Sequence, residues 1–138
     1  MARFRHSFCS PFSSEIEELG DIEENELIDK FNKIPWDGII QKMSTMSESE
    51  IHYSPSIEFE DKSTKHGLTM SGVGDKNLEE FYVFYKRPKR VKRFFGLFEH
   101  DNPNYLTDVL GQTRQNVVEL INALIEKNYQ LLDQKIKR

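Results

Sequence analysis

The sequence predicts a single α+β domain with short N-terminal helices, an antiparallel four- to five-stranded meander sheet, and a long C-terminal helix packed on the sheet. Near both ends of the chain, over residues 21–43 and 113–136, apolar residues recur every three to four positions, which is the period of a helix. Between these segments they alternate every second position, which is the period of a strand. Helices separated from a run of strands are typical of the α+β class. The length of 138 residues suits one domain, 1–138.

The chain is expected to begin with a mobile arm and then a helix. Residues 1–14 are mostly polar and form the expected arm. Asp21 is followed three positions later by Glu24, the spacing of a capping box, in which each side chain accepts a hydrogen bond from the other residue's backbone N–H. The apolar residues that follow lie on one helical face, so a helix is predicted from about residue 22 to residue 32.

A second helix is predicted over residues 36–43. Pro35 suits the start of a helix, because its missing N–H group needs no partner there. Apolar residues follow at spacings of three and four, at Trp36, Ile39, Ile40 and Met43. The polar stretch 44–49 then separates this acidic helical part, 15–46, from the sheet.

The sheet is predicted over residues 51–110. Ile57 and Phe59 alternate with glutamates, which indicates a half-buried strand. A turn is expected over 62–67, and the alternation resumes over 68–73.

The strand pattern is strongest over residues 80–86. The face expected to lie under the C-terminal helix consists of Phe81, Val83 and Tyr85. Tyr82 and Phe84 lie on the other face, which indicates a central strand covered on both sides. Pro88 is expected to end the strand, because it has no N–H group to donate.

The last part of the chain is predicted to complete the sheet and close it with a helix. Two strands are expected over 91–98 and 105–110, with a turn at 100–104 between them. Thr113 is the predicted N-cap of a closing helix over 113–135. Its apolar stripe steps by three or four through Val117, Ile121, Leu124, Asn128, Leu132 and Ile136.

The charges are strongly segregated along the chain, although the formal net charge is only −4. Residues 15–29 include eight acidic side chains and no basic one. Proteins that block nucleases or other basic toxins present such surfaces, because charge complementarity speeds association and fixes its register. The candidate partner-binding residues are therefore Glu17, Glu18, Asp21, Glu23, Glu24, Glu26 and Asp29, with Trp36 as the aromatic anchor.

A basic run in the predicted sheet gives an alternative function. Residues 86–93 hold six basic side chains, Lys86, Arg87, Lys89, Arg90, Lys92 and Arg93. Aromatic residues lie on both sides of this run, over the segment 82–98. Aromatic rings on a sheet can stack on nucleic-acid bases while neighbouring cations bind phosphates. The acidic first part of the chain counts against nucleic-acid binding, which is therefore the second hypothesis.

The sequence contains no pattern that indicates catalysis, a metal or a cofactor. The four histidines are scattered, and no serine lies in the Gly-x-Ser-x-Gly turn that presents a nucleophile in hydrolases. No His or Cys pair has the spacing of metal ligands. Glu60, Asp61 and Lys62 are similar to the acid and lysine of metal-dependent nucleases, which keeps a small nuclease as a third hypothesis. The prediction is a protein that is not an enzyme and has no catalytic residues.

A cytoplasmic protein without membrane contact is expected. The N-terminus lacks the apolar segment of about 7–15 residues that a secretory signal contains. No stretch approaches the ~18 consecutive apolar residues of a transmembrane helix. Cys9 is the single cysteine, which excludes an internal disulfide.

Four segments, 53–60 (YSPSIEFE), 80–88 (EFYVFYKRP), 95–98 (FGLF) and 105–108 (YLTD), precede the predicted closing helix. In layout they resemble small bacterial immunity proteins, which are encoded beside polymorphic or contact-dependent toxins. This resemblance implies a toxin inhibitor that forms a toxin–antitoxin complex by direct protein–protein interaction. The implied partner is a cognate toxin or effector domain with a basic surface. The resemblance assigns no catalytic residues.

Overall fold

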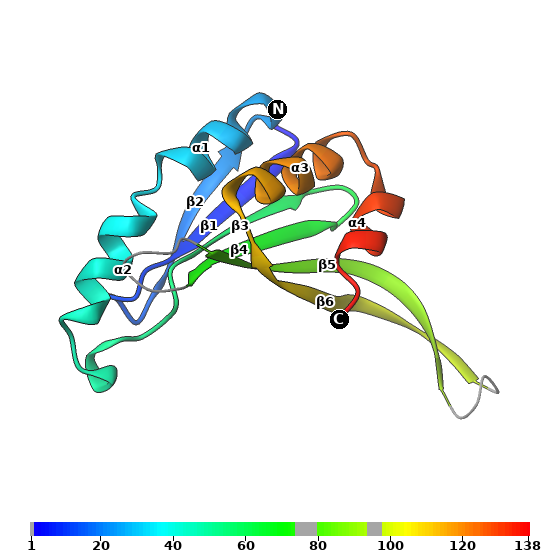
Figure 1. Cartoon of the computed structure of the whole chain (residues 1–138). Helices are drawn as coiled ribbons and strands as arrows, with labels where there is room; N and C mark the ends of the chain where they lie inside the picture. Colours follow the sequence, from blue (N-terminus) through cyan, green and yellow to red (C-terminus); the bar gives the residue numbers. More distant parts are fainter. Residues whose placement is uncertain (1, 74–79, 94–97) are drawn as a thin grey trace.

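The computed structural model describes residues 2–73, 80–93 and 98–138, apart from the side chains of 90–93, 98–101 and 103. It has an α+β fold with a six-stranded antiparallel sheet in the order β2-β1-β3-β4-β5-β6 (Figure 1). The strands are β1 (Phe4–Cys9), β2 (Ile16–Ile22), β3 (Ser56–Asp61), β4 (Gly67–Val73), β5 (Glu80–Arg93) and β6 (Phe98–Gln112). The order differs from the sequence order only at β1, which lies between β2 and β3.

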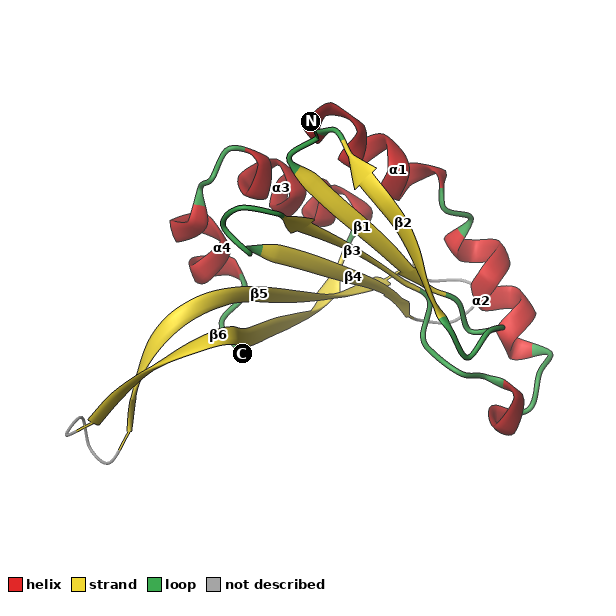
Figure 2. Ribbon diagram, turned by 180° about the vertical axis from the view of Figure 1, so that it is seen from behind, coloured by secondary structure: helices red, strands yellow, loops and turns green. Residues whose placement is uncertain are grey.

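The helices lie on one face of this sheet, and among the described residues no helix covers the other face (Figures 1 and 2). They are α1 (Leu27–Lys33), α2 (Trp36–Ser44), α3 (Arg114–Ile125) and α4 (Tyr129–Lys135), with two short 3₁₀ helices, η1 (Glu24–Glu26) and η2 (Glu48–Glu50). The apolar core lies between the sheet and these helices. In the part of the chain that the structure describes, no helix combines the length and apolarity needed to cross a membrane.

The predicted mobile arm is wrong, because Phe4–Cys9 form β1 inside the sheet. This strand pairs with β2 on one side and β3 on the other. Phe4 is fully buried and Phe8 packs against the core, so the two rings fix which face of β1 points inward. Since β1 and β2 both come from the first 22 residues, the sheet has six strands rather than four to five.

The acidic helical part also begins later than predicted, because Ile16–Ile22 form β2 at the edge of the sheet. Gly20 adopts φ 85°, and the register with β1 shifts beside it, so β2 is locally distorted. The capping box starts at Glu23 rather than at Asp21. The backbone N–H of Glu23 donates to the carboxylate of Glu26 at 3.3 Å, and helical structure follows from η1 into α1.

The second predicted helix is confirmed as α2, and it places Trp36 in the core. Trp36 is 1% exposed, and its indole N–H donates to the backbone carbonyl of Phe31 at 3.1 Å. Its ring packs edge-on against Phe81 of β5. The ring also lies over Gly72 of β4, where a Cβ atom would come within 2.7 Å of it. Only glycine therefore allows α2 to approach the sheet this closely.

The middle of the predicted sheet is confirmed in β3, β4 and the start of β5. The inward face of β5 is as predicted, because Phe81, Val83 and Tyr85 are buried and belong to the same core as α3. The predicted central position of β5 is also confirmed, since it pairs with β4 and β6. Cover on its second face was wrongly predicted, because Tyr82 and Phe84 point to the side that no described helix covers.

Pro88 does not end β5, contrary to the prediction. The strand continues to Arg93, and its register with β6 shifts between Arg87 and Lys89. Pro88 thus lies at an irregularity of the ladder, where its missing N–H group removes no regular hydrogen bond.

Beyond Pro88, β5 and β6 extend past the neighbouring strands as a two-stranded ribbon (Figures 1 and 2). Residues 91–93 are extended as predicted but continue β5, and Phe98 begins β6, so the described part of 91–98 does not form a separate strand. The turn predicted over 100–104 is wrong, because these residues belong to β6. The strand predicted over 105–110 is confirmed as part of β6. Residues 94–97 lie outside the described residues.

The long closing helix was also wrongly predicted, because it is divided into α3 and α4. Its predicted start is confirmed. The Thr113 side chain accepts a hydrogen bond from the backbone N–H of Asn116 at 3.1 Å, and the Asn116 side chain accepts one from the N–H of Thr113 at 3.1 Å. This reciprocal pair satisfies backbone donors that α3 cannot satisfy internally.

The division occurs at Lys127, which adopts φ 58° in the left-handed region. The backbone N–H of Lys127 donates to Leu124 at 3.2 Å, and that of Asn128 donates to Ala123 at 2.8 Å. This pair of hydrogen bonds is a Schellman motif, which ends a helix. The Asn128 side chain then accepts a hydrogen bond from the N–H of Leu131 at 3.3 Å and caps α4. The apolar stripe therefore continues across a change of direction.

Candidate functional site

An acidic surface runs along β2, η1 and α1. It consists of eight carboxylate side chains, all of which belong to exposed residues: Glu15, Glu17, Glu18, Asp21, Glu23, Glu24, Glu26 and Asp29. All seven acidic residues that the sequence predicted as partner-binding are exposed, although Glu17 and Glu18 are successive residues of β2 and point to opposite faces of the sheet. They line an edge strand and the two helical segments that follow it, rather than one helix.

Half of the acidic surface pairs with basic residues of the same chain. The pairs are Glu18 with Arg5 at 3.7 Å, Asp21 with Lys62 at 2.9 Å, Glu24 with Arg3 at 2.9 Å, and Asp29 with Lys33 at 2.8 Å. Exposed pairs of this kind contribute little to stability. The other four, Glu15, Glu17, Glu23 and Glu26, have no ion pair with any described residue. The acidic surface therefore keeps an excess of negative charge toward solvent.

Trp36 cannot serve as the exposed anchor that the sequence predicted. The ring is buried under α2, and its N–H group is already bonded to Phe31. An indole in this position stabilises the fold and contacts no partner. The prediction failed because a helical apolar spacing does not say which residue of the stripe stays exposed.

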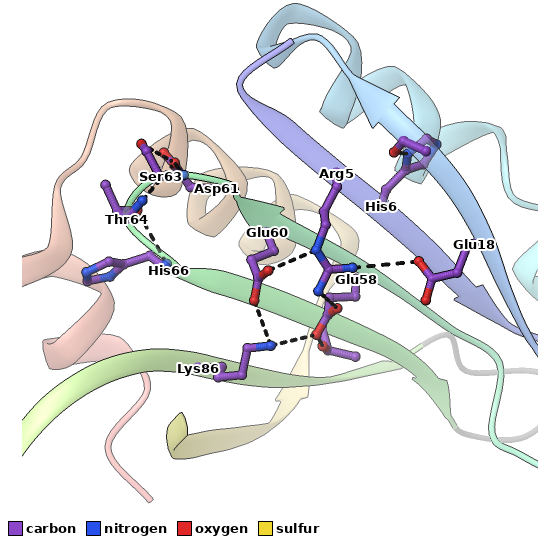
Figure 3. Close-up of polar contacts among 12 residues, drawn as sticks. Arg5, His6, Glu18, Glu58, Glu60, Asp61, Ser63, Thr64, His66 and Lys86 are labelled. Atoms are coloured by element: carbon purple, nitrogen blue, oxygen red, sulfur yellow. Dashed lines mark hydrogen bonds and ion pairs between the residues drawn. The ribbon is translucent and has the colours of Figure 1, made fainter. Parts of the chain in front are cut away.

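A network of charges lies on the uncovered face, next to the acidic surface (Figure 3). Arg5 of β1 bonds Glu60 at 2.9 Å and approaches Glu58 at 3.7 Å, both on β3. Lys86 of β5 pairs with Glu60 at 2.8 Å and approaches Glu58 at 3.6 Å. Because Arg5 also approaches Glu18, the network continues into the acidic surface. Two cations thus meet three carboxylates.

Glu60 is the most buried carboxylate of this network, at 5% exposure. Burial alone would raise its pKa, but the hydrogen bond and charge of Lys86, together with those of Arg5, lower the pKa instead. Burial likewise would lower the pKa of Lys86, and the pairing with Glu60 and Glu58 raises it. Both side chains are therefore charged at neutral pH, and their charges satisfy each other within the sheet.

Asp61, the neighbour of Glu60, points to the opposite face and organises the turn from β3 to β4 (Figure 3). One carboxylate oxygen accepts the backbone N–H groups of Ser63 at 2.9 Å and Thr64 at 3.1 Å, and the other accepts Arg3 at 2.7 Å. These bonds overcome the opposing effect of burial and lower the pKa of Asp61 to about 2. The adjacent acids therefore serve the fold on opposite faces. Among the described residues, no group of three or more His, Cys, Asp or Glu side chains could hold a metal ion.

The basic run is largely used within the protein where its side chains are described. Lys86 belongs to the network on the uncovered face. Arg87 is 5% exposed, pairs with Asp133 of α4 at 2.9 Å and lies over the Tyr85 ring. Lys89 is exposed and lies over the ring of Tyr105. The side chains of Arg90, Lys92 and Arg93 lie outside the described residues.

The sequence does not predict the uncovered face as a protein-binding site. It predicts Arg5 in an arm, and Tyr82 and Phe84 on a covered face, where they also belong to the segment 82–98 of the nucleic-acid alternative. The signal that could have found it is the alternation in β5, where the second set of residues includes Lys86 as well as aromatic rings. A charged residue in that set favours a solvent-facing side.

No known protein family, curated protein or solved structure matches this chain. Function is therefore inferred from the residues of the acidic surface and of the uncovered face.

Proposed function

We propose that this chain is an immunity-type binding protein that acts in the cytoplasm and is not an enzyme. It neutralises a cognate toxin or effector domain by direct binding, steered by electrostatic attraction. The observation that supports the proposal best is the acidic surface, in which eight exposed carboxylates follow one another along an edge strand and the next two helical segments.

The charge of this surface specifies the chemistry of the partner. Carboxylates in such number repel one another, and a partner rich in Lys and Arg would relieve that repulsion. Complementary charge raises association rates by about 10–10³-fold at low salt. A fast association is what an inhibitor needs when it must bind a toxin before the toxin acts.

The proposal is tested with the gene adjacent to that of this chain. The C-terminal domain of the adjacent gene's product is expressed from an inducible promoter, with and without this chain, and growth is recorded. We expect the domain alone to stop growth and co-expression to restore it. Equal growth arrest with and without the chain would reject the neutralising role.

The role of the acidic surface is tested by charge reversal. Glu15→Lys and Glu17→Lys break no ion pair with a described residue and remove no helix cap, so the fold should tolerate them. We expect the double variant to bind the adjacent domain on the order of 10-fold more slowly at low salt. Glu119→Lys on α3 with Glu126→Lys directly after it gives the same change in net charge on another part of the surface. Equal loss in both double variants would assign the effect to net charge rather than to this surface.

The β5–β6 ribbon favours nucleic-acid binding as the second candidate function. The ribbon extends beyond the rest of the sheet and includes most of the basic run (Figure 1). A two-stranded ribbon fits the major groove of DNA. Gel-shift assays at low salt, with single- and double-stranded probes, test this function. Binding that is lost on Lys89→Glu would support it, and no shift with either probe would reject it.

A further inference from the structure

The uncovered face of the sheet carries an aromatic pair that lies outside the apolar core. Tyr82 and Phe84 alternate with the buried residues of β5, so their side chains stand on the side away from the helices. The two rings stack on each other, with centroids 4.4 Å apart and planes at 7°. The Tyr82 hydroxyl donates to the carboxylate of Asp108 on β6 at 2.9 Å, which fixes the orientation of the pair.

Two aliphatic side chains of β6, Leu106 and Leu110, stand on the same face with Asp108 between them, and together with the aromatic pair they are called the apolar strip. Leu106 lies opposite Lys86 in the register and is 54% exposed. Leu110 follows at period-two spacing and is 46% exposed. Among the large apolar residues that the structure describes, only Ile16 has comparable exposure. Single exposed apolar residues are ordinary, but several contiguous ones, with a polar rim, mark an interaction surface.

The charges beside the apolar strip indicate which partner fits. The described cations beside the strip are Arg5, Lys86 and Arg138, and the carboxylates are Glu18, Glu58, Glu60 and Asp108, which pairs with Arg138 at 3.2 Å. The carboxylates therefore exceed the cations by one, and the acidic surface continues from Glu18. Glu58 makes its ion pairs only at 3.6 and 3.7 Å, which is longer than a charge-assisted hydrogen bond. Its carboxylate therefore keeps the capacity to bond a cation from outside. An acid-rich rim repels a phosphate backbone and attracts a protein that presents Lys or Arg.

We propose that the uncovered face is the docking surface for a protein partner whose contact region is apolar at its centre and carries Lys or Arg beside it. The proposal rests on the proposed function and names where its interface is centred. Tyr82, Phe84 and Leu106 supply the apolar centre, and Glu58 supplies the adjoining carboxylate. Tyrosine is over-represented among residues that dominate binding energy, and here its hydroxyl is satisfied within the chain. The apolar strip therefore anchors the partner in this proposal, because the buried Trp36 cannot contact it.

The test uses synthetic peptides selected from a random display library on the immobilised full chain. The enriched peptides are synthesised, their Kd values are measured by calorimetry, and the binding site is mapped by NMR shift perturbation. We expect sequences that combine Lys or Arg with aromatic or aliphatic residues and that perturb the amides of β5 and β6 around residues 82–86 and 106. No enrichment, enrichment of acidic peptides, or perturbation confined to other elements would overturn the proposal.

Variants distinguish specific binding at the apolar strip from non-specific hydrophobic binding to any exposed apolar side chain. Phe84→Thr with Leu106→Thr keeps residues that favour strands, and we expect it to weaken peptide binding at least 10-fold. Ile16→Thr removes an equally exposed apolar side chain on β2, at 53% exposure, and should leave the Kd unchanged. Circular dichroism and thermal unfolding check that each variant is folded. An equal loss in Ile16→Thr, or no loss in the double variant, would overturn the proposal.

The outcomes of the two experiments are distinguishable. If co-expression protects cells and the Phe84→Thr, Leu106→Thr variant protects equally well, the docking surface is wrong and the neutralising function stands. If the peptides bind the strip as expected and the wild-type chain gives no protection, the function is wrong and the docking surface stands. If the wild-type chain self-associates and the double variant does not, the proposed partner protein is wrong. The docking surface then binds a second copy of this chain.

Discussion

The imidazole ring of His66 stacks on the phenol ring of Tyr129, with centroids 3.7 Å apart and planes at 15°. The stack joins the turn before β4 to the first residue of α4. On its other side, Nδ1 of His66 lies 2.6 Å from the hydroxyl of Tyr85. Arg87 reaches the same helix through its ion pair with Asp133 at 2.9 Å. The C-terminal helix is therefore held on the sheet by a cluster of titratable groups.

This cluster predicts a loss of stability below neutral pH. Burial and then the charge of Arg87 lower the pKa of His66, against the opposing charges of Asp61 and Asp133. The unfolded chain therefore binds this proton more readily than the folded chain. The contribution is complete above the unfolded pKa of about 6.5 and is lost as the pH falls from that value through the lower pKa of the folded chain. Each unit of difference between the two pKa values is worth about 1.4 kcal/mol.

The measurement is urea unfolding at pH about 7.5 and about 5.5, with His66→Phe as the matched variant. Phenylalanine keeps a ring on Tyr129 and cannot titrate. We expect the wild type to lose more free energy of unfolding between the two pH values than the variant loses, because all other titratable groups are common to both. Equal losses would assign the acid sensitivity to other groups.

The inner part of the fold follows from the sequence, and its edges do not. β3, β4 and the start of β5 have one buried face each, so their alternation between apolar and polar residues is clear. β2 is an edge strand with six of its seven residues at least partly exposed, so burial imposes no alternation on it. The spacing of three between Ile16 and Leu19, among acidic residues, therefore matches the sequence pattern of a helix. An exposed edge strand leaves little trace in an apolar pattern.

Backbone conformation explains the other failures. The break between α3 and α4 depends on Lys127 in the left-handed region, and neither a glycine nor a proline marks it in the sequence. The passage of β5 through Pro88 depends on a shift in register that the partner strand supplies. The acidic surface was predictable because carboxylates stay exposed in either a strand or a helix. The uncovered face was not, because it requires knowing where every helix lies.

The left-handed Lys127 predicts a stabilising substitution. For a residue with a Cβ atom, the left-handed conformation costs about 1–2 kcal/mol of conformational free energy, whereas glycine adopts it without that cost. Lys127→Gly should raise the free energy of unfolding by about 0.5–1 kcal/mol, since the greater freedom of glycine in the unfolded chain offsets part of the gain. The expected increase in Tm is about 2–4 °C. Lys135→Gly, within α4, is the control and should lower the Tm. A lower Tm for both variants would contradict the role of the Schellman motif.

The contact between Gly72 and Trp36 predicts a destabilising substitution. A Cβ atom at residue 72 would lie 2.7 Å from the indole ring, which is 1% exposed and has no free space to enter. Gly72→Ala should therefore cost about 1–3 kcal/mol. Gly38→Ala on α2 meets nothing within 4 Å, and it should stabilise by about 0.5–1 kcal/mol through helix propensity. Fluorescence of the single tryptophan during denaturant unfolding measures both. Equal stability of the two variants would show that α2 moves to relieve the contact.

Asp61 predicts how the protein responds to strong acid. Its pKa is lowered to about 2, because the bonds from Arg3 and from the turn outweigh the effect of burial. A lowered pKa gives stability that is present above the unfolded value of about 3.9 and is lost as the pH falls through the folded value, an amount on the order of 2 kcal/mol. Asp61→Asn should destabilise the protein by about 2–4 kcal/mol at pH 7, because the variant loses the negative charge beside Arg3 and its NH2 group must face the donors either of Arg3 or of Ser63.

The same variant should also flatten the dependence of stability on pH between about 5 and 2. Asp21→Asn is the control. Its carboxylate pairs with Lys62 at a similar distance, 2.9 Å, but it is exposed, so the loss should stay below about 1 kcal/mol. Urea unfolding across this pH range measures both variants. If Asp61→Asn follows the wild-type pH dependence, the acid response belongs to Glu60 and its partners on the uncovered face, which also lose their pairing when the carboxylate is protonated.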